Sequence, residues 1–149
     1  MSYGNSIAGY VTYREIGVKT ASQGKLVVML YEGAISNLEK AIALVKEGGK
    51  IAPCDIENYG NYLQKAMDII AELETSLNMD EGGDIAKNLM SLYVFFNKRI
   101  LAATMSHDAK ELSSVHGMLS ELKDSWVAAS NSAANTKMTG SFPAVSVTG

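Results

Sequence analysis

The stretch LVVMLYEGAISNLEKAIALV, residues 26–45, decides the fold. Its apolar residues recur at alternating steps of four and three, which places them along one line of an α-helix. That line comprises Val27, Tyr31, Ala34, Leu38, Ala41 and Val45. Ser22 is a good N-cap before this stretch, and Gly48 and Gly49 follow it where a helix should stop. The sequence therefore predicts a first amphipathic helix between Ser22 and Gly48.

Three further stretches repeat this pattern, and Pro53, DEGG at residues 80–83 and His107-Asp108 separate them. Their expected inward lines are Tyr59, Leu63, Ala66, Ile70, Leu73 and Leu77; then Ile85, Leu89, Leu92, Phe96, Ile100 and Ala103; and last Leu112, Val115, Leu119, Leu122, Trp126 and Ala129. Asp108 is the expected cap of the fourth helix, with Glu111 completing a capping box. Short connections make consecutive helices antiparallel, so the predicted fold class is an all-α, antiparallel up-down four-helix bundle.

The length of 149 residues fits a single core, and the composition changes at both ends of the chain. We expect the bundle to occupy residues 22–130. Residues 1–21 hold three tyrosines between glycines and are expected to form an N-terminal arm that lies against a surface. Residues 131–149 are small, polar and almost uncharged, so we expect a flexible, disordered tail.

Charge and composition exclude several classes of function. A net charge of −3 argues against binding of nucleic acid or of anionic membranes. No apolar run approaches the ~18 residues of a membrane span, so no membrane insertion is expected. The first residues lack the pattern of a signal peptide, which favours the cytoplasm. A single cysteine, Cys54, excludes an internal disulfide and a Cys-based zinc site, and we interpret it as structural.

The sequence predicts no enzyme, no metal site and no cofactor. A di-iron bundle needs Glu-x-x-His motifs, and neither His107 nor His116 has a glutamate three residues before it. The inward lines are apolar and leave no buried carboxylate pair for acid–base chemistry. No haem-attachment motif, glycine-rich phosphate loop or nucleophile elbow is present.

Some apolar residues remain after each helix has its inward line. Residues 26–31 are apolar almost all round the helix, with Leu26 and Met29 off the core line. The third helix has a second line on the face opposite Phe96, formed by Met90, Val94, Leu101 and Met105. The N-terminal arm, a second copy of the chain or a partner's apolar helix would cover such faces. A bundle with rotated helices, which leaves these residues partly exposed, is the alternative, but the methionine content favours the binding of a partner's helix in a groove.

Several short motifs, taken in order, resemble the family of flagellar export chaperones, FliS, over about residues 10–127. The motifs are Tyr13, VKTAS at 18–22, MLYEGA at 29–34, GGDIAKNL at 82–89, KRIL at 98–101 and Trp126. The resemblance implies a small helical bundle that holds newly made flagellin in the cytoplasm. It implies that flagellin's C-terminal region folds into apolar grooves, which prevents premature polymerisation, and that the N-terminal arm occupies a groove when flagellin is absent.

We therefore expect a partner-binding surface on the arm, the first helix and the third helix. Its expected residues are Tyr10, Tyr13, Val18, Leu26, Met29, Met90, Val94, Lys98, Leu101 and Met105. Lys98, beside Arg99, either borders solvent or meets an acidic or polar rim of the partner. An export-gate protein as a further partner stays open. The alternative function is a structural or regulatory bundle that self-associates, for example as a homodimer, through the same faces.

Overall fold

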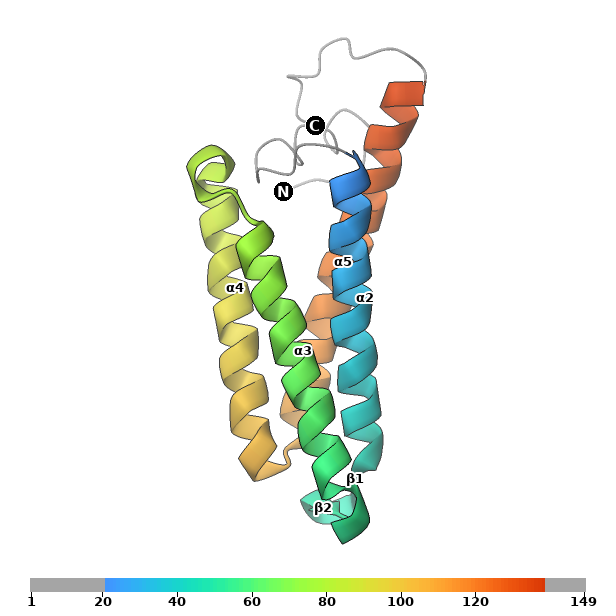
Figure 1. Ribbon diagram of the computed structural model, residues 1–149, viewed down its shortest axis with the longest axis vertical. Helices are drawn as coiled ribbons and strands as arrows, with labels where there is room; N and C mark the ends of the chain where they lie inside the picture. Colours follow the sequence, from blue (N-terminus) through green and yellow to red (C-terminus); the bar gives the residue numbers. More distant parts are fainter. Residues whose placement is uncertain (1–20, 139–149) are drawn as a thin grey trace.

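The computed structural model describes residues 21–138 and shows an all-α bundle, as the sequence predicts. Its helices are α2 (Ala21–Leu44), α3 (Ile56–Ser76), α4 (Met79–Ser106) and α5 (Ala109–Met138). Figure 1 shows consecutive helices running in opposite directions along one long axis. Both α3 and α5 pack against α2 and against α4, which places α2 and α4 at opposite corners of the bundle.

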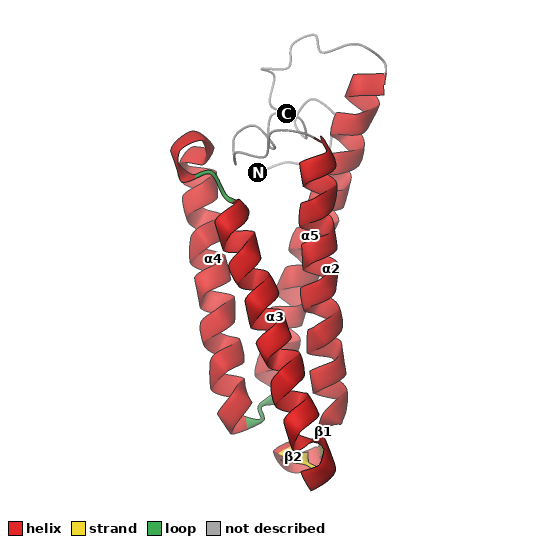
Figure 2. Ribbon diagram, in the orientation of Figure 1, coloured by secondary structure: helices red, strands yellow, loops and turns green. Residues whose placement is uncertain are grey.

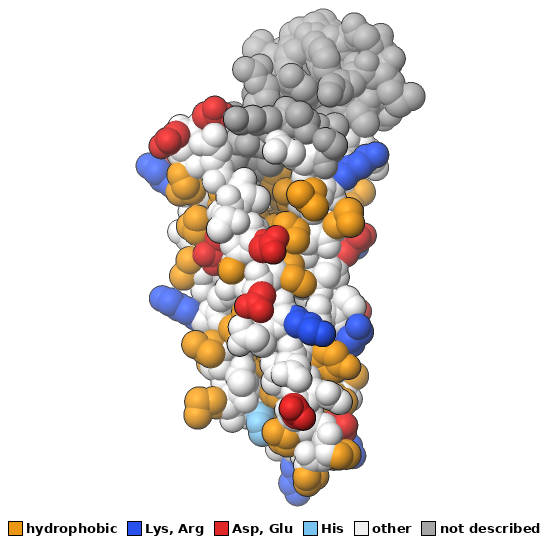
Figure 3. All heavy atoms as spheres, viewed as in Figure 1, with side chains coloured by type: hydrophobic (Ala, Val, Ile, Leu, Met, Phe, Trp, Pro, Cys, Tyr) orange, Lys and Arg blue, Asp and Glu red, His pale blue; other side chains and the backbone are white. Residues whose placement is uncertain are grey.

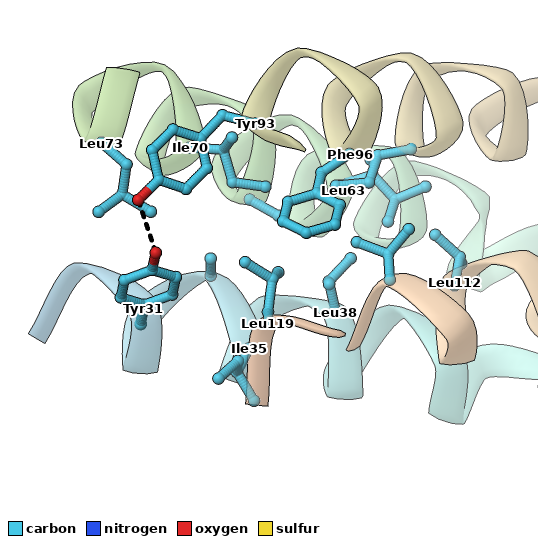
Figure 4. Close-up of a cluster of buried hydrophobic side chains, with 14 of the residues drawn as sticks. Tyr31, Ile35, Leu38, Leu63, Ile70, Leu73, Tyr93, Phe96, Leu112 and Leu119 are labelled. Carbon is cyan, nitrogen blue, oxygen red and sulfur yellow. Dashed lines mark hydrogen bonds between the residues drawn. The ribbon is translucent and has the colours of Figure 1, made fainter. Parts of the chain in front are cut away.

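The core consists of the apolar lines that the helical periodicity predicts, with two exceptions on α4. In α2, α3 and α5 the predicted inward residues are buried except Val45, Leu77 and Leu122, which are partly buried. Figure 4 shows side chains from all four helices pointing into one shared core, with Phe96 of α4 among them. Burial of these side chains is the main favourable contribution to folding.

The prediction for α4 was wrong at two positions, where the buried residue is the one that follows the predicted residue. Its buried line is Ala86, Leu89, Tyr93, Phe96, Ile100 and Ala103, whereas Ile85 and Leu92 are only partly buried. Tyr93 can be buried because its hydroxyl has a partner: it lies 2.5 Å from the hydroxyl of Tyr31, across the bundle. The indole Nε1 of Trp126 also donates to the Tyr31 hydroxyl, at 3.2 Å. A buried tyrosine with a satisfied hydroxyl packs as a large apolar residue.

The first two helices are joined by a short β-hairpin that the sequence analysis missed. Helix α2 ends at Leu44, and β1 (Val45–Lys46) pairs with antiparallel β2 (Lys50–Ile51). The turn between them, η1 (Glu47–Gly49), has Gly48 at φ 78° and Gly49 at φ 75°. Such left-handed conformations favour glycine, which is why these two glycines end the helix with a hairpin. A second short turn, η2 (Pro53–Asp55), leads into α3, and Figure 2 shows the hairpin at one end of the bundle.

Caps fix the ends of α4 and α5. The side chain of Asn78 accepts hydrogen bonds from the backbone of Asp80 and Glu81 at the start of α4. Asp108 accepts from the backbone of Lys110 and Glu111, which confirms it as the cap of α5. The predicted return contact of the capping box is absent among these residues, because the Glu111 carboxylate pairs with Arg99 at 2.5 Å.

Helix α5 is longer than the sequence analysis predicted. We expected the bundle to end at residue 130, but the helix continues to Met138. The first glycine after residue 130 is Gly140, so no strong helix breaker interrupts the run before that point. The remainder of the expected tail, like most of the expected N-terminal arm, lies outside the described residues.

Buried tyrosines should make the bundle lose stability at high pH. The Tyr59 hydroxyl donates to the backbone oxygen of Ala103 at 2.6 Å, and burial together with the charge of Asp108 raises the pKa of Tyr59 to about 12. An unfolded tyrosine has a pKa of about 10. Between pH 10 and 12 only the unfolded state loses this proton, so the free energy of unfolding falls as pH rises through this window.

Denaturant titrations from pH 9 to 12 should therefore show a steeper loss of stability for the wild-type protein than for Tyr59→Phe. Because burial also raises the pKa of Tyr93, the variant should still lose some stability in the same direction. Identical slopes for the two proteins would show that Tyr59 ionises as freely in the folded state as in the unfolded chain.

Candidate partner-binding surface

Large apolar side chains outside the core are concentrated on α2 and α4. The exposed fraction is 55% for Leu26, 64% for Met29, 61% for Leu101 and 87% for Met105, and Val94 is exposed at 38%. Met90 is partly buried. None of these side chains is sealed inside the bundle by its own four helices. Their exposure matches the surplus of apolar surface expected from the sequence.

The apolar residues on α2 face the side where α3 lies. Gly33 marks this side, because a Cβ atom added there would come within 3.2 Å of Ile69 Cδ1 on α3. Leu26, Met29 and Leu30 precede Gly33 by seven, four and three residues, which places them on the same side of the helix. We call Leu26, Met29 and Leu30 the α2 patch. It lies near the N-terminal end of α2.

The apolar residues on α4 also lie on the side toward α3. Asn97 marks this side, because its Nδ2 donates to the backbone oxygen of Met67 in α3 at 3.3 Å. The residues at seven and three before Asn97, and at four and eight after it, share that side of the helix. They are Met90, Val94, Leu101 and Met105, and we call them the α4 patch. The two patches therefore border the same helix from opposite sides.

Figure 3 shows the face that α3 presents between the patches. Hydrophobic side chains gather over upper α2 and along the edge formed by α4, and acidic side chains lie between them. Tyr31 and Tyr93 touch through their hydroxyls and so lie at the same level of the bundle. Leu101 and Met105 follow Tyr93 by eight and twelve residues, a rise of about 12 to 18 Å along α4. The lower part of the α4 patch is therefore well below the α2 patch.

The two basic residues of the Lys98-Arg99 pair lie on different sides of α4 and have different contacts. Arg99 faces α5: it pairs with Glu111 and lies over the Phe95 ring, 5.0 Å from its centroid. Lys98 is exposed and has no ion-pair partner among the described residues. It follows Val94 by four residues and so borders the α4 patch. Of the pair, only Lys98 is both beside the α4 patch and without an ion pair among the described residues.

The structure brings the expected site residues of α2 and α4 to the two sides of one helix. Tyr10, Tyr13 and Val18 lie outside the described residues. Leu30 is an addition to the expected set; it belongs to the apolar run of residues 26–31 but was not singled out. Within the described part of the chain, no group of three or more His, Cys, Asp or Glu residues is arranged to hold a metal ion. The helices described there are also too polar or too short to cross a membrane.

Fold and surface together define an all-α bundle with apolar side chains exposed on both sides of one helix. Comparison with known proteins gives the family. A family model described as flagellar protein FliS matches residues 6–133. The chain therefore belongs to the FliS family.

Individual relatives agree with this assignment. The flagellar secretion chaperone FliS of Vibrio cholerae is 37% identical, over 76% of this chain and 82% of that protein. The protein of the same name from Salmonella typhimurium is 35% identical, over 75% of this chain and 79% of its own length. The Bacillus subtilis protein is 28% identical, over 78% and 82% respectively. These relatives are secretion chaperones, and chaperones are not a class of enzyme.

Proposed function

We propose that this chain binds the C-terminal region of flagellin in the cytoplasm and prevents its polymerisation before export. The observation that supports this most strongly is the exposure of the α2 patch and the α4 patch on either side of α3. Apolar surface of this kind on a bundle is typical of a binding site for another chain. The relationship to flagellar secretion chaperones favours a flagellar export substrate as that chain.

The spacing of the α4 patch suits a helical ligand. Its four side chains extend from Met90 to Met105 of α4, a rise of fifteen residue steps or about 22 Å. An amphipathic helix of the partner could lay its apolar face along this length, as in other helix-in-groove complexes. Three of the eight methionines are in the two patches, and their adaptable side chains suit irregular contacts. If the partner segment folds only on binding, part of the gain from apolar burial offsets the cost of ordering it.

The proposal includes the arm residues Tyr10, Tyr13 and Val18 as further contacts, either to flagellin or to the α2 patch when flagellin is absent. Val18 precedes the start of α2 by three residues, so the arm is tethered beside that patch. An export-gate protein, as a further partner of the same complex, is not required by this proposal. Self-association through the same patches is the competing function.

Titration with a synthetic peptide of flagellin's C-terminal region tests the proposal. We expect saturable binding, and a gain of helical signal in circular dichroism beyond the sum of the two free components. A peptide from flagellin's central region is the control and should not bind. Concentration-dependent dimers of the free chain, together with no binding of the C-terminal peptide, would instead support the self-associating bundle.

A further inference from the structure

The α2 patch lies open among the described residues, and the last helix of the bundle ends near it. Leu26 and Met29 of the patch are exposed at 55% and 64%. Helix α5 packs beside α2. Figure 1 shows the end of α5 and the start of α2 at the same end of the bundle. The residues that follow Met138 therefore leave α5 on the end of the molecule that carries the patch.

A hydrogen bond relates the levels of the two helices. The indole Nε1 of Trp126 donates to the Tyr31 hydroxyl at 3.2 Å, so these residues mark one level of α5 and α2. Leu26 and Met29 precede Tyr31 by five and two residues, which places them about 7.5 and 3 Å nearer that end of the bundle. Met138 follows Trp126 by twelve residues, a rise of about 18 Å in the same direction. Helix α5 thus ends about 10 to 15 Å beyond the patch.

Residues 139–149, which we call the C-terminal segment, are long enough to return to the patch. The sideways distance is about 10 Å, the separation of two packed helix axes. The whole path is then about 14 to 18 Å, which four to six extended residues cover at about 3.3 Å each. Phe142, Val145 and Val147 follow Met138 by four, seven and nine residues and so come within reach. Gly140 is of the residue type that most readily lets a chain turn back after a helix.

The composition of the C-terminal segment suits an apolar surface. It contains Phe142, Val145 and Val147 and no charged residue, so it can lie on the patch without removing water from a charge. Pro143 disfavours a helix and favours an extended chain. The other residues of the segment are small or polar, so it cannot form a core of its own. Its apolar side chains need a surface that the bundle supplies.

The N-terminal arm is the other part of the chain tethered near the patch, and its composition suits the patch less well. Tyr13 is followed directly by Arg14 and Glu15, and Lys19 comes shortly before α2. An arm laid on the patch would bring these charges against apolar side chains, which costs desolvation. The uncharged C-terminal segment has no such cost. The chemistry therefore favours this segment as the occupant.

We propose that the C-terminal segment covers the α2 patch in the free chain and has to leave it before a partner chain binds there. The cover itself goes beyond the proposed function, and only the competition with flagellin rests on it. Three apolar side chains make a weak, reversible cover. If the patch is uncovered about a fifth of the time, the apparent affinity of a partner falls about fivefold. The cover then keeps the patch from weak apolar ligands and yields to a stronger one.

Methyl nuclear magnetic resonance of the whole chain without partner tests the cover. The variant Phe142→Ser/Val145→Ser removes two apolar side chains of the segment. Its matched control, Thr139→Ser/Thr148→Ser, introduces serine at two positions of the same segment and removes no large apolar side chain. We expect the methyl resonance of Met29 to shift in the first variant, because the Phe142 ring no longer lies near it. In the control it should stay at the wild-type position.

Other occupants of the patch would give different results. If the N-terminal arm covers the patch, Met29 should shift in Tyr10→Ser/Tyr13→Ser and not in Phe142→Ser/Val145→Ser. If a second copy covers it, the Met29 resonance should move with protein concentration and equally in every variant. Either result, or a Met29 resonance that is the same in all variants, would overturn the proposal.

Affinity for flagellin's C-terminal peptide tests the competition. Phe142→Ser/Val145→Ser should bind the peptide about fivefold more tightly than the wild-type chain, and the serine control should bind like wild type. Equal affinities of the first variant and wild type would show that the segment does not compete. If the wild-type chain does not bind the peptide, the proposed function fails, and the Met29 shift still decides whether the segment covers the patch.

Discussion

The variant Leu101→Asp is expected to bind flagellin's C-terminal peptide about 30-fold more weakly than the wild-type chain. Leu101 is 61% exposed in the free bundle and lies in the lower part of the α4 patch, between Val94 and Met105. Burying a leucine side chain contributes about 1.5 to 3 kcal/mol, and a buried carboxylate without a partner adds a further cost. A loss of about 2 kcal/mol corresponds to the stated factor. Fluorescence anisotropy with a labelled peptide gives the dissociation constant.

A neighbouring residue provides the matched control. Ala102 is exposed on the same helix and follows Arg99 by three residues, which places it on the side toward α5. Ala102→Asp should bind like wild type. The melting temperature of Leu101→Asp should also stay near that of wild type, since little of the side chain is in the core. Equal binding by Leu101→Asp and wild type would remove Leu101 from the site, and a large loss of stability would make it a core residue.

The second large effect concerns folding. Phe96→Ala should lower the free energy of unfolding by about 3 to 5 kcal/mol, because Phe96 is fully buried and its removal leaves a cavity among the four helices. Phe95→Ala is the matched control. Phe95 is 37% exposed and contacts Arg99 and the edge of the core, so its loss should cost about 1 kcal/mol.

Urea denaturation of the two variants measures both effects. The comparison tests the orientation of α4 about its own axis, because a helix turned by one residue would exchange the roles of Phe95 and Phe96. Similar losses for the two variants would show that α4 does not hold Phe96 in the core as the structure has it.

Much of the fold could be predicted from the helical periodicity and the breaks. Apolar steps of three and four residues identified most core positions, and Asp108 identified the start of α5. The burial of Tyr93 rather than Leu92 in α4 could not be predicted, because the Tyr93 hydroxyl needs a hydrogen-bond partner that α4 itself does not supply. That partner, Tyr31, comes from another helix 62 residues away. The hairpin was missed because strands of two residues carry no alternating pattern.

The sequence predicted which apolar residues of the candidate site lie outside the core. It did not predict how they are arranged as a surface. The sequence shows that Met29 and Leu101 are off the inward lines, since this follows from the period of each helix alone. It does not show that both face α3, because that depends on the order of helices around the bundle. Two contacts reveal the order: Gly33 against Ile69, and Asn97 with the Met67 backbone.

The central claim is that flagellin's C-terminal region covers the patches on both sides of α3. Nuclear magnetic resonance of methyl-labelled methionines tests this directly, because the chain carries its own probes. Met29 is in the α2 patch, Met90 and Met105 are in the α4 patch, and Met118 follows Glu111 by two turns on the side of α5 toward α4. On addition of the peptide, the resonances of Met29, Met90 and Met105 should shift together and saturate at one stoichiometry, while Met118 stays in place. Shifts at Met118 with Met29 and Met105 unchanged would contradict the account.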